Sequence, residues 1–173
     1  AAPKLKGIVK YGVGIDAIDI PAAIARGIPV VNVPEYAEET VAEGAFALMI
    51  ALAKRLPEVG RTMSRDGWVW PSGHWLGRDI AGATLGLVGT GRIGCSMARM
   101  AGQGFRARIL GYDPHVDAAG MAASGIEKVD DLQAMLRQCD LVSLHAVLNE
   151  RTRGLIGAAE LACLKPSAIL VNV

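Results

Sequence analysis

One segment constrains the fold of this chain more than any other: TLGLVGTGRIGCSMARM, residues 84–100. Its apolar start predicts a β-strand that runs directly into a glycine turn and then into a helix. Gly89, Gly91 and Gly94 give the turn the pattern G-x-G-x-x-G. In this pattern the first glycine permits the tight turn, the second lets the backbone approach a pyrophosphate, and the third lets helix and strand pack closely. The helix N-terminus offers N–H groups to the same phosphates. The segment therefore predicts a dinucleotide site, with a ligand-free packing turn as the alternative.

Asp113 supplies the second half of this fingerprint. It ends the predicted strand RARILGYD, 19 residues after Gly94, where an acidic side chain accepts hydrogen bonds from the adenosine ribose hydroxyls. The same carboxylate would repel a 2′-phosphate, and the following residues PHVDAA contain no arginine or lysine. These features predict NAD rather than NADP as the cofactor. The alternative is that Asp113 only starts a turn before Pro114.

Strand and helix patterns alternate from Thr84 onward, which predicts βαβ units with right-handed crossovers. The fold class that follows is α/β, with a Rossmann-type doubly wound parallel sheet. A content of 21 glycines and only 5% aromatic residues suits the close packing of helices on such a sheet. We expect strands at residues 84–89, 106–113, 126–129, 140–146 and 167–173, and helices at about 92–103, 118–123, 130–139 (with Asp130 as the N-cap) and 157–166.

The segment before residue 38 predicts a smaller strand–helix–strand unit. A strand at residues 7–10 leads into a glycine loop, and a helix at about 20–26 follows, with Gly27 as its C-terminal stop. The apolar run IPVVNV then forms a second strand.

A long helix is predicted over residues 38–55. It is apolar almost all round between residues 45 and 52, so we expect it to be buried on more than one side. Either an internal core or a subunit interface would provide that burial. After it, residues 56–83 predict a short helical start and then a loop rich in tryptophan, glycine and proline.

Composition and charge argue against several classes of protein. The net charge is +1, from 18 basic and 17 acidic residues, and no basic patch indicates nucleic-acid binding. The longest apolar run, residues 45–53, is too short to cross a bilayer, and we expect no membrane association and no secretory leader. Cys95, Cys139 and Cys163 lack CxxC spacing, and the three histidines lack ligand spacing. We therefore expect reduced thiols, no metal site and a cytoplasmic location.

Several stretches taken together resemble a known family, the D-isomer-specific 2-hydroxyacid dehydrogenases, and lean toward its phosphoglycerate dehydrogenase-like members. The resemblance covers essentially all 173 residues, and a generic Rossmann domain would lack the first and fifth of these stretches. They are, in order, KYGVGIDAID, VVNVPEYAEETVAEGAFALMIALAKR, GATLGLVGTGRIG, LGYDP, CDLVSLHAVLNERTRGLIG and LKPSAILVNV.

The resemblance implies two α/β domains. Residues 1–35 would be part of a flavodoxin-like substrate domain, and residues 36–173 would be the NAD-binding Rossmann domain, truncated at its C-terminal end. The family also implies a homodimer formed through the helix at residues 40–55. Its partners would be a small 2-hydroxy or 2-keto acid substrate and the cofactor NAD, with no nucleic acid and no membrane.

The resemblance also assigns roles to individual residues. In KYGVG, the N–H groups around Val13 and Gly14 would hold the substrate carboxylate, with a plain strand-to-helix turn as the alternative. Thr152 would help to shape a loop near the cofactor. The family usually has proline at the position of Val147 and often threonine at that of Asn149. The residues expected to bind the cofactor are Gly89, Gly91, Arg92, Ile93, Gly94, Asp113, His145, Ala146, Thr152 and Val173.

The implied activity is that of an NAD-dependent oxidoreductase acting on the CH–OH group of a D-2-hydroxy acid, or reducing a 2-keto acid with NADH. The family's chemistry uses an arginine, a glutamate and a histidine, which would all lie after Val173. His145 is interpreted as a structural residue at a strand end, so no catalytic residue is assigned and a polypeptide of these 173 residues is predicted to be inactive. The alternatives are a non-catalytic, NAD-sensing dimeric module of the C-terminal-binding-protein type, and a scaffold that has lost the cofactor. The glycine motif and Asp113 argue against the second of these.

Overall fold

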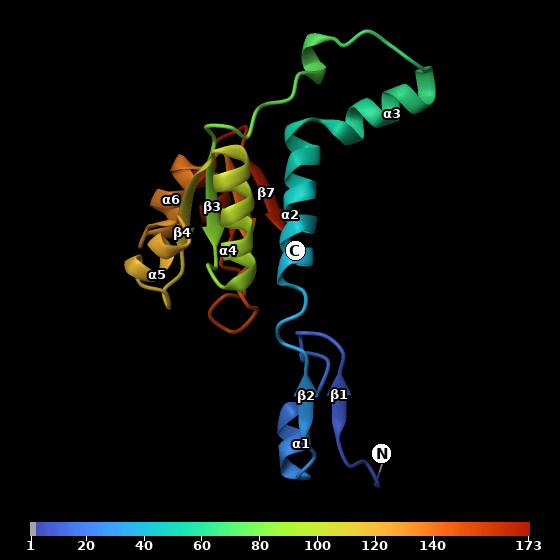
Figure 1. Cartoon of the computed structure of the whole chain (residues 1–173), viewed down its shortest axis with the longest axis vertical. Helices are drawn as coiled ribbons and strands as arrows, with labels where there is room; N and C mark the ends of the chain where they lie inside the picture. The colour runs from blue at the N-terminus through green and yellow to red at the C-terminus, as the bar shows by residue number, and fades with distance from the viewer. Residues whose placement is uncertain (1–2) are drawn as a thin grey trace. The chain divides into compact units, whose positions relative to one another are not determined.

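The computed structural model describes residues 3–173, except for the side chain of His74. The chain divides into a unit that ends at Thr40 and a second unit from Val41 to Val173 (Figure 1). Helix α2 (Glu38–Ala53) begins in the first unit and continues into the second.

The first unit is the predicted strand–helix–strand element. Strands β1 (Ile8–Lys10) and β2 (Val30–Asn32) pair in parallel, and α1 (Ile20–Ala25) connects them. The Asp19 carboxylate caps α1 by accepting a hydrogen bond from the N–H of Ala22 at 2.9 Å. Gly27, with φ of 62°, follows the helix in the left-handed conformation that favours glycine. The predicted helix and its stop are therefore confirmed.

The second unit is built on a five-stranded parallel sheet. In the sheet the strands lie in the order β5-β4-β3-β6-β7. The chain enters at the central strand β3, moves outward to one edge, and then returns to fill the other side. This is the doubly wound arrangement that the sequence predicts, and it places the point where strand order reverses between β3 and β6. The strands are β3 (Thr84–Val88), β4 (Arg108–Tyr112), β5 (Glu127–Lys128), β6 (Leu141–Leu144) and β7 (Ile169–Asn172).

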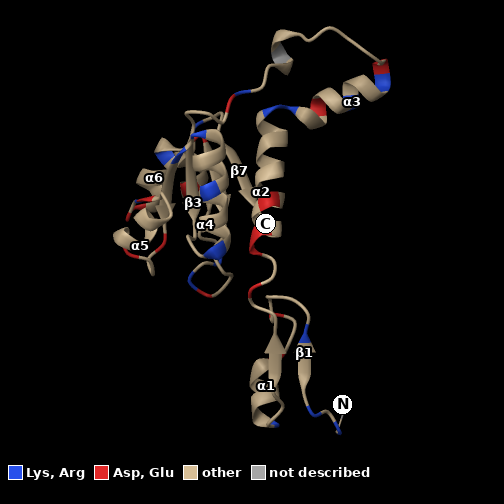
Figure 2. Cartoon of the chain, viewed as in Figure 1, with Lys and Arg blue, Asp and Glu red and all other residues tan. Residues whose placement is uncertain are grey.

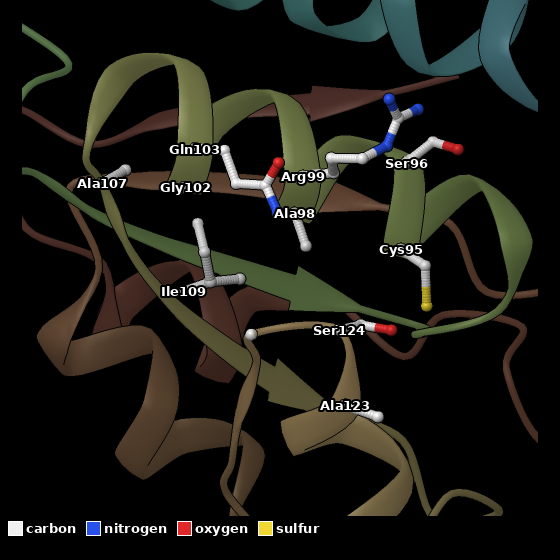
Figure 3. A pocket seen from close by; sticks show the side chains of 11 residues that line it. Cys95, Ser96, Ala98, Arg99, Gly102, Gln103, Ala107, Ile109, Ala123 and Ser124 are labelled. Carbon is white, nitrogen blue, oxygen red and sulfur yellow. The ribbon is translucent and has the colours of Figure 1, made fainter.

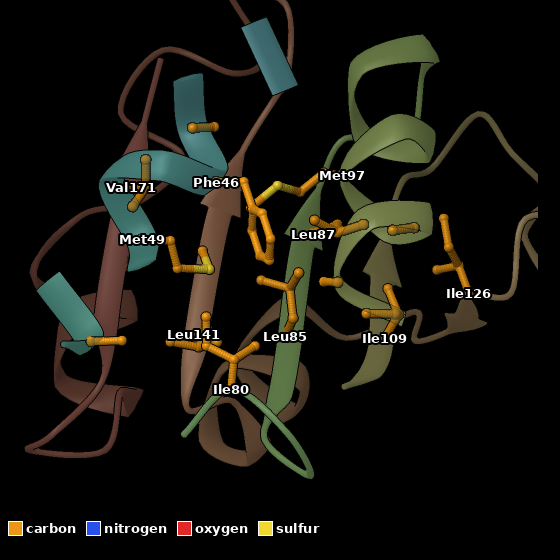
Figure 4. Packing of buried hydrophobic residues seen from close by; sticks show 14 of the residues in the cluster. Phe46, Met49, Ile80, Leu85, Leu87, Met97, Ile109, Ile126, Leu141 and Val171 are labelled. Carbon is orange, nitrogen blue, oxygen red and sulfur yellow. The ribbon is translucent and has the colours of Figure 1, made fainter. Parts of the chain in front are cut away.

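Helices cover both faces of this sheet. On one face α2 and α4 (Arg92–Arg99) pack on alternate strand residues, and Phe46 and Met49 of α2 lie with Leu85 and Leu87 of β3 in the larger core cluster (Figure 4). α5 (Ala118–Ala123) joins this face through Met121. On the other face the core is formed with α6 (Leu132–Gln138), and residues at the end of α7 (Ala158–Cys163) pack against it. Both faces are thus buried, which explains the nearly continuous apolar strands.

Helix α2 differs from the expectation of burial on more than one side. Its buried residues, which include Phe46 and Met49, lie along one stripe, whereas Leu48 is 53% exposed and Leu52 is 50% exposed. The chain's own core therefore covers only one side of the helix. Among the described residues, no helix is both long and apolar enough to cross a membrane.

Three other elements differ from the sequence prediction. The helix expected at residues 38–55 ends at Ala53, since Arg55 adopts a φ of 55°, and an 11-residue helix α3 (Leu56–Asp66) follows where only a short helical start was expected. A short 3-10 turn, η1 (Gly73–Trp75), interrupts the loop beyond it. The helix expected at about residues 92–103 changes from α4 into a π-helical segment, η2 (Met100–Gly104).

The N-cap of α6 is Asp131, and the prediction of Asp130 was wrong. Asp131 Oδ1 accepts a hydrogen bond from the N–H of Ala134 at 3.0 Å, whereas Asp130 is exposed and forms an ion pair with the half-buried Lys128. Asp131→Ala should therefore lower the free energy of unfolding by about 1 kcal/mol, the usual value of a helix cap. Asp130→Ala should change it by less than about 0.5 kcal/mol, because the Asp130 carboxylate is 88% exposed and solvent screens its ion pair. Urea denaturation of both variants measures the difference, and equal losses would contradict the assignment.

Candidate functional site

A cavity of about 430 Å³ lies at the carboxyl ends of β3 and β6, where the order of strands reverses. Crevices at this point of an open parallel sheet are the usual ligand sites of such folds. Its walls come from the glycine turn after β3, the segment after β4 and the loop after β6. The lining residues are Val88, Gly89, Gly91, Tyr112, Asp113, Pro114, His115, His145, Ala146, Val147, Asn149, Arg151, Thr152 and Leu155.

The three glycines of the turn are surrounded differently. A Cβ atom on Gly89, where φ is 90°, would lie 2.7 Å from the main-chain nitrogen of Ala146. A Cβ atom on Gly94 would collide with the carbonyl oxygen of Gly89. A Cβ atom on Gly91, by contrast, would meet nothing within 4 Å, and Gly91 lines the cavity. The first and third glycines are thus required by protein packing, whereas the space beside Gly91 is free for a ligand.

Asp113 follows β4 and is fixed by two neighbouring main-chain groups. Its Oδ2 accepts a hydrogen bond from the N–H of Thr90 at 3.0 Å, and its Oδ1 accepts one from the N–H of His115 at 2.9 Å. The second contact is the turn foreseen as the alternative interpretation of Asp113. The Thr90 hydroxyl also donates to Oδ2, at 3.4 Å, which leaves one lone pair on Oδ1 without a protein donor. The side chain therefore keeps the capacity to accept a hydrogen bond from a ribose hydroxyl. The turn and the ribose role are therefore compatible.

The loop over residues 145–155 is held by two of its own side chains. The Thr152 hydroxyl donates to the carbonyl oxygen of Val147 at 2.6 Å and accepts from the N–H of Asn149 at 2.8 Å. Asn149 Oδ1 accepts hydrogen bonds from the N–H groups of Arg151 and Thr152 at 2.9 and 3.1 Å. These contacts fix the cavity wall that the loop after β6 supplies. They form although Val147 and Asn149 are not the residues usual at these positions in the family.

Replacing Thr152 by valine should loosen this loop, because the substitution removes both hydrogen bonds of the hydroxyl. We expect the affinity for NADH to fall by roughly fivefold, which corresponds to about 1 kcal/mol for a hydroxyl network of this size. Thr152→Ser retains the hydroxyl and is the matched control. Fluorescence titration with NADH compares the two variants, and the same affinity in both would show that the hydroxyl has no part in shaping the site.

His145 lines the cavity directly after β6, and its imidazole has no hydrogen-bond partner in the described part of the chain. Both ring nitrogens are buried and unpaired there, as is the hydroxyl of Ser143 two residues earlier. Burial lowers the pKa of His145 to about 4, so the ring is neutral at pH 7. A neutral, buried imidazole at a strand end fits a structural role better than that of a proton donor to substrate.

The sequence prediction and the cavity overlap only in part. Six of the ten residues expected at the cofactor line it: Gly89, Gly91, Asp113, His145, Ala146 and Thr152. Arg92 and Ile93 instead open α4, Gly94 packs against the turn, and Val173 follows β7 with 53% of its surface exposed. The lining residues that the sequence did not indicate are Val88, Tyr112, Pro114, His115, Arg151 and Leu155. Tyr112, Pro114 and His115 lie next to Asp113 in the sequence, so the expected position of Asp113 was enough to predict them.

The expected substrate loop lies in the first unit. Asn32 donates a side-chain hydrogen bond to the carbonyl oxygen of Val13 at 2.8 Å, and the N–H of Val33 donates to the carbonyl oxygen of Gly12 at 3.2 Å. Within the described residues, no protein acceptor is found for the N–H groups of Val13 or Gly14. The loop is therefore anchored through its carbonyl oxygens while these two donors stay available.

A second cavity, of about 520 Å³, lies between α4, η2 and the turn after α5. Figure 3 shows Cys95, Arg99, Gln103 and Ser124 around it. The three cysteines are free, and no group of three or more potential metal ligands occurs in the described part of the chain. Acidic and basic segments are interspersed over the second unit (Figure 2).

Comparison with known proteins gives a consistent result. The model of the family described as D-isomer specific 2-hydroxyacid dehydrogenase, NAD binding domain, matches residues 46–173. The chain is 44% identical to a glyoxylate reductase of Korarchaeum cryptofilum and 38% identical to a D-3-phosphoglycerate dehydrogenase of Methanocaldococcus jannaschii, in each case over 99% of this chain. It covers only 52% and 32% of those two proteins.

A solved structure agrees with these relatives. The D-lactate dehydrogenase of Aquifex aeolicus, in complex with NAD and lactic acid, superposes with a TM-score of 0.85 at 32% identity. The alignment covers 98% of this chain and 50% of that protein. The open space beside Gly91 and the position of Asp113 fit the dinucleotide that such a domain holds. The chain therefore belongs to the D-isomer specific 2-hydroxyacid dehydrogenases, and residues 46–173 are its NAD-binding domain.

Proposed function

We propose that this protein is an NAD-dependent oxidoreductase that acts on the CH–OH group of a D-2-hydroxy acid and, in reverse, reduces a 2-keto acid. The observation that carries the proposal is the cavity between β3 and β6, in which Gly91 leaves room for a pyrophosphate and Asp113 stands where a ribose is expected. When bound, the nicotinamide cofactor supplies or accepts the hydride. Relatives named glyoxylate reductase and D-3-phosphoglycerate dehydrogenase support this reaction class.

Within this proposal, residues 36–173 form the nucleotide domain and residues 1–35 form part of the substrate domain. The N–H groups of Val13 and Gly14 would hold the substrate carboxylate, since main-chain donors suit an anion and neither has a protein acceptor in the described residues. Asp113 would favour NAD over NADP by repelling a 2′-phosphate. No catalytic side chain is assigned to residues 1–173.

Two measurements test the proposal. Fluorescence titration should show binding of NADH, and absorbance at the nicotinamide band should follow oxidation of NADH with a panel of 2-keto acids that includes glyoxylate and pyruvate. We expect a polypeptide of these 173 residues to bind NADH without turnover. Absence of NADH binding at millimolar concentration would overturn the cofactor assignment, and turnover by the 173-residue polypeptide would overturn the assignment of catalysis to other residues.

We also propose a homodimer formed through the helix at residues 40–55. The support is the exposed side of α2, where Leu48 and Leu52 present apolar surface that the chain's own core leaves uncovered. Leu48→Glu should shift the protein from dimer to monomer in sedimentation velocity. Leu161→Glu is the matched control, because Leu161 is 49% exposed on α7, on the other face of the sheet. The same effect in both variants, or in neither, would contradict this interface.

A further inference from the structure

Two charged side chains line the cavity at the switch point, Asp113 and Arg151. They reach it from different segments: Asp113 follows β4, whereas Arg151 belongs to the loop after β6. The main-chain N–H of Arg151 donates to Asn149 Oδ1 at 2.9 Å, which fixes the backbone at this position. Within the described residues the guanidinium itself makes no hydrogen bond or ion pair with the protein. Arg151 thus brings an unpaired cation to a site whose other charge is a carboxylate.

Asp113 and Arg151 line one cavity of about 430 Å³, so a ligand bound there meets both charges. Asp113 already accepts two main-chain hydrogen bonds, so part of its charge is compensated within the protein. A phosphate bound in the cavity would therefore meet the Asp113 carboxylate, whose charge is partly compensated, and the Arg151 guanidinium, whose charge is not.

We propose that Arg151 is a specificity-determining residue, which together with Asp113 sets how strongly the site rejects a nucleotide that carries a 2′-phosphate. Arginine is well suited to this role, because its planar group of N–H donors matches a phosphate and keeps its charge at all physiological pH values. The absence of arginine and lysine directly after Asp113 predicts NAD rather than NADP, but the loop after β6 supplies a cation to the cavity from a position 38 residues further along the chain. This inference rests on the proposed function.

The experiment uses two nucleotides that differ only by the phosphate in question, 2′,5′-ADP and 5′-AMP. Their dissociation constants are measured by isothermal titration calorimetry on the wild-type protein and on the variants Asp113→Asn, Asp113→Asn/Arg151→Gln and Asp113→Asn/Arg153→Gln. Arg153 is the matched control, because it lies in the same loop and does not line the cavity. Binding of 5′-AMP reports that each variant is folded and that the nucleotide site is intact.

The expected result is a preference for 2′,5′-ADP over 5′-AMP that rises at least tenfold in Asp113→Asn. The added Arg151→Gln substitution should abolish most of that gain, whereas Arg153→Gln should retain it. The gain should also shrink as salt is raised from 50 to about 500 mM, because it is electrostatic. An equal preference for 2′,5′-ADP in Asp113→Asn and Asp113→Asn/Arg151→Gln would overturn the inference. If both variants still bound 5′-AMP, the proposed function would be unaffected by that result. Failure of both nucleotides to bind the wild-type protein would overturn the proposed function and this inference with it.

Discussion

Gly91→Ala is expected to weaken NADH binding by at least about tenfold, or about 1.4 kcal/mol, and to lower the free energy of unfolding by less than about 1 kcal/mol, because alanine is a poorer N-cap than glycine. The reason is that a Cβ atom at this position would meet no protein atom within 4 Å and would occupy the space where the backbone approaches a pyrophosphate. Gly91 is also the N-cap of α4 and has a φ of −69°, which alanine adopts without strain. Fluorescence titration with NADH and thermal unfolding together test the prediction.

Gly94→Ala serves as the contrasting variant. A Cβ atom there would press on the main chain at Gly89, so the turn and α4 must separate. We expect a loss of about 1–3 kcal/mol in the free energy of unfolding, with a fall in Tm of several degrees. If Gly91→Ala lowered Tm as much as Gly94→Ala does, or if it bound NADH normally, the space beside Gly91 would not be the pyrophosphate site.

Stability should fall on mild acidification because of His145. The unfolded imidazole takes up a proton near pH 6.5, whereas burial holds the pKa in the folded protein at about 4. Between these values the unfolded state binds more protons, so the free energy of unfolding rises with pH across this window. The neutral His145 contributes up to about 3 kcal/mol to the free energy of unfolding. This contribution is complete above pH 6.5 and is lost as the pH falls through 4.

His145→Leu removes the titrating group and should flatten the dependence of unfolding free energy on pH between 6.5 and 4. Urea denaturation at a series of pH values measures this slope for each protein. The matched control is His115→Leu, since His115 is exposed and also lines the cavity. Wild-type and His145→Leu curves that ran parallel would show that the His145 pKa is not lowered in the folded protein.

The regular part of the fold could be predicted because its signals are local. The strand at Thr84–Val88, the glycine turn and the first turns of α4 follow each other in the sequence, so apolar patterning and turn chemistry suffice to identify them. The same holds for α5, whose bounds of Ala118 and Ala123 agree with the expectation. Asp131 was missed because two adjacent aspartates offer equal capping chemistry, and only the register of the first turn decides between them.

The candidate site was harder to predict because half of it is non-local. Gly89, Gly91 and Asp113 belong to one strand–helix–strand unit, β3-α4-β4, with a known spacing. Arg151 and Leu155, by contrast, reach the cavity only because of the path of the loop after β6. That path depends on the hydrogen bonds of Thr152 and Asn149, which no periodicity reveals. The exposed side of α2 is a related case, since composition shows that a helix is apolar but not which of its sides the core will cover.

The order of strands in the sheet determines when, during synthesis, a ligand site first exists. The central strand β3 pairs with β4 soon after it is made, but Leu85 pairs with Leu141 only when 56 further residues are available. The nascent chain would thus carry one wall of the dinucleotide cavity, from Gly89 to His115, well before the other wall at His145 to Leu155 is translated. Because such distant pairing is slow, acquisition of nucleotide affinity would mark the final docking of β6. The coenzyme would therefore bind the fully folded domain and not the incomplete nascent chain.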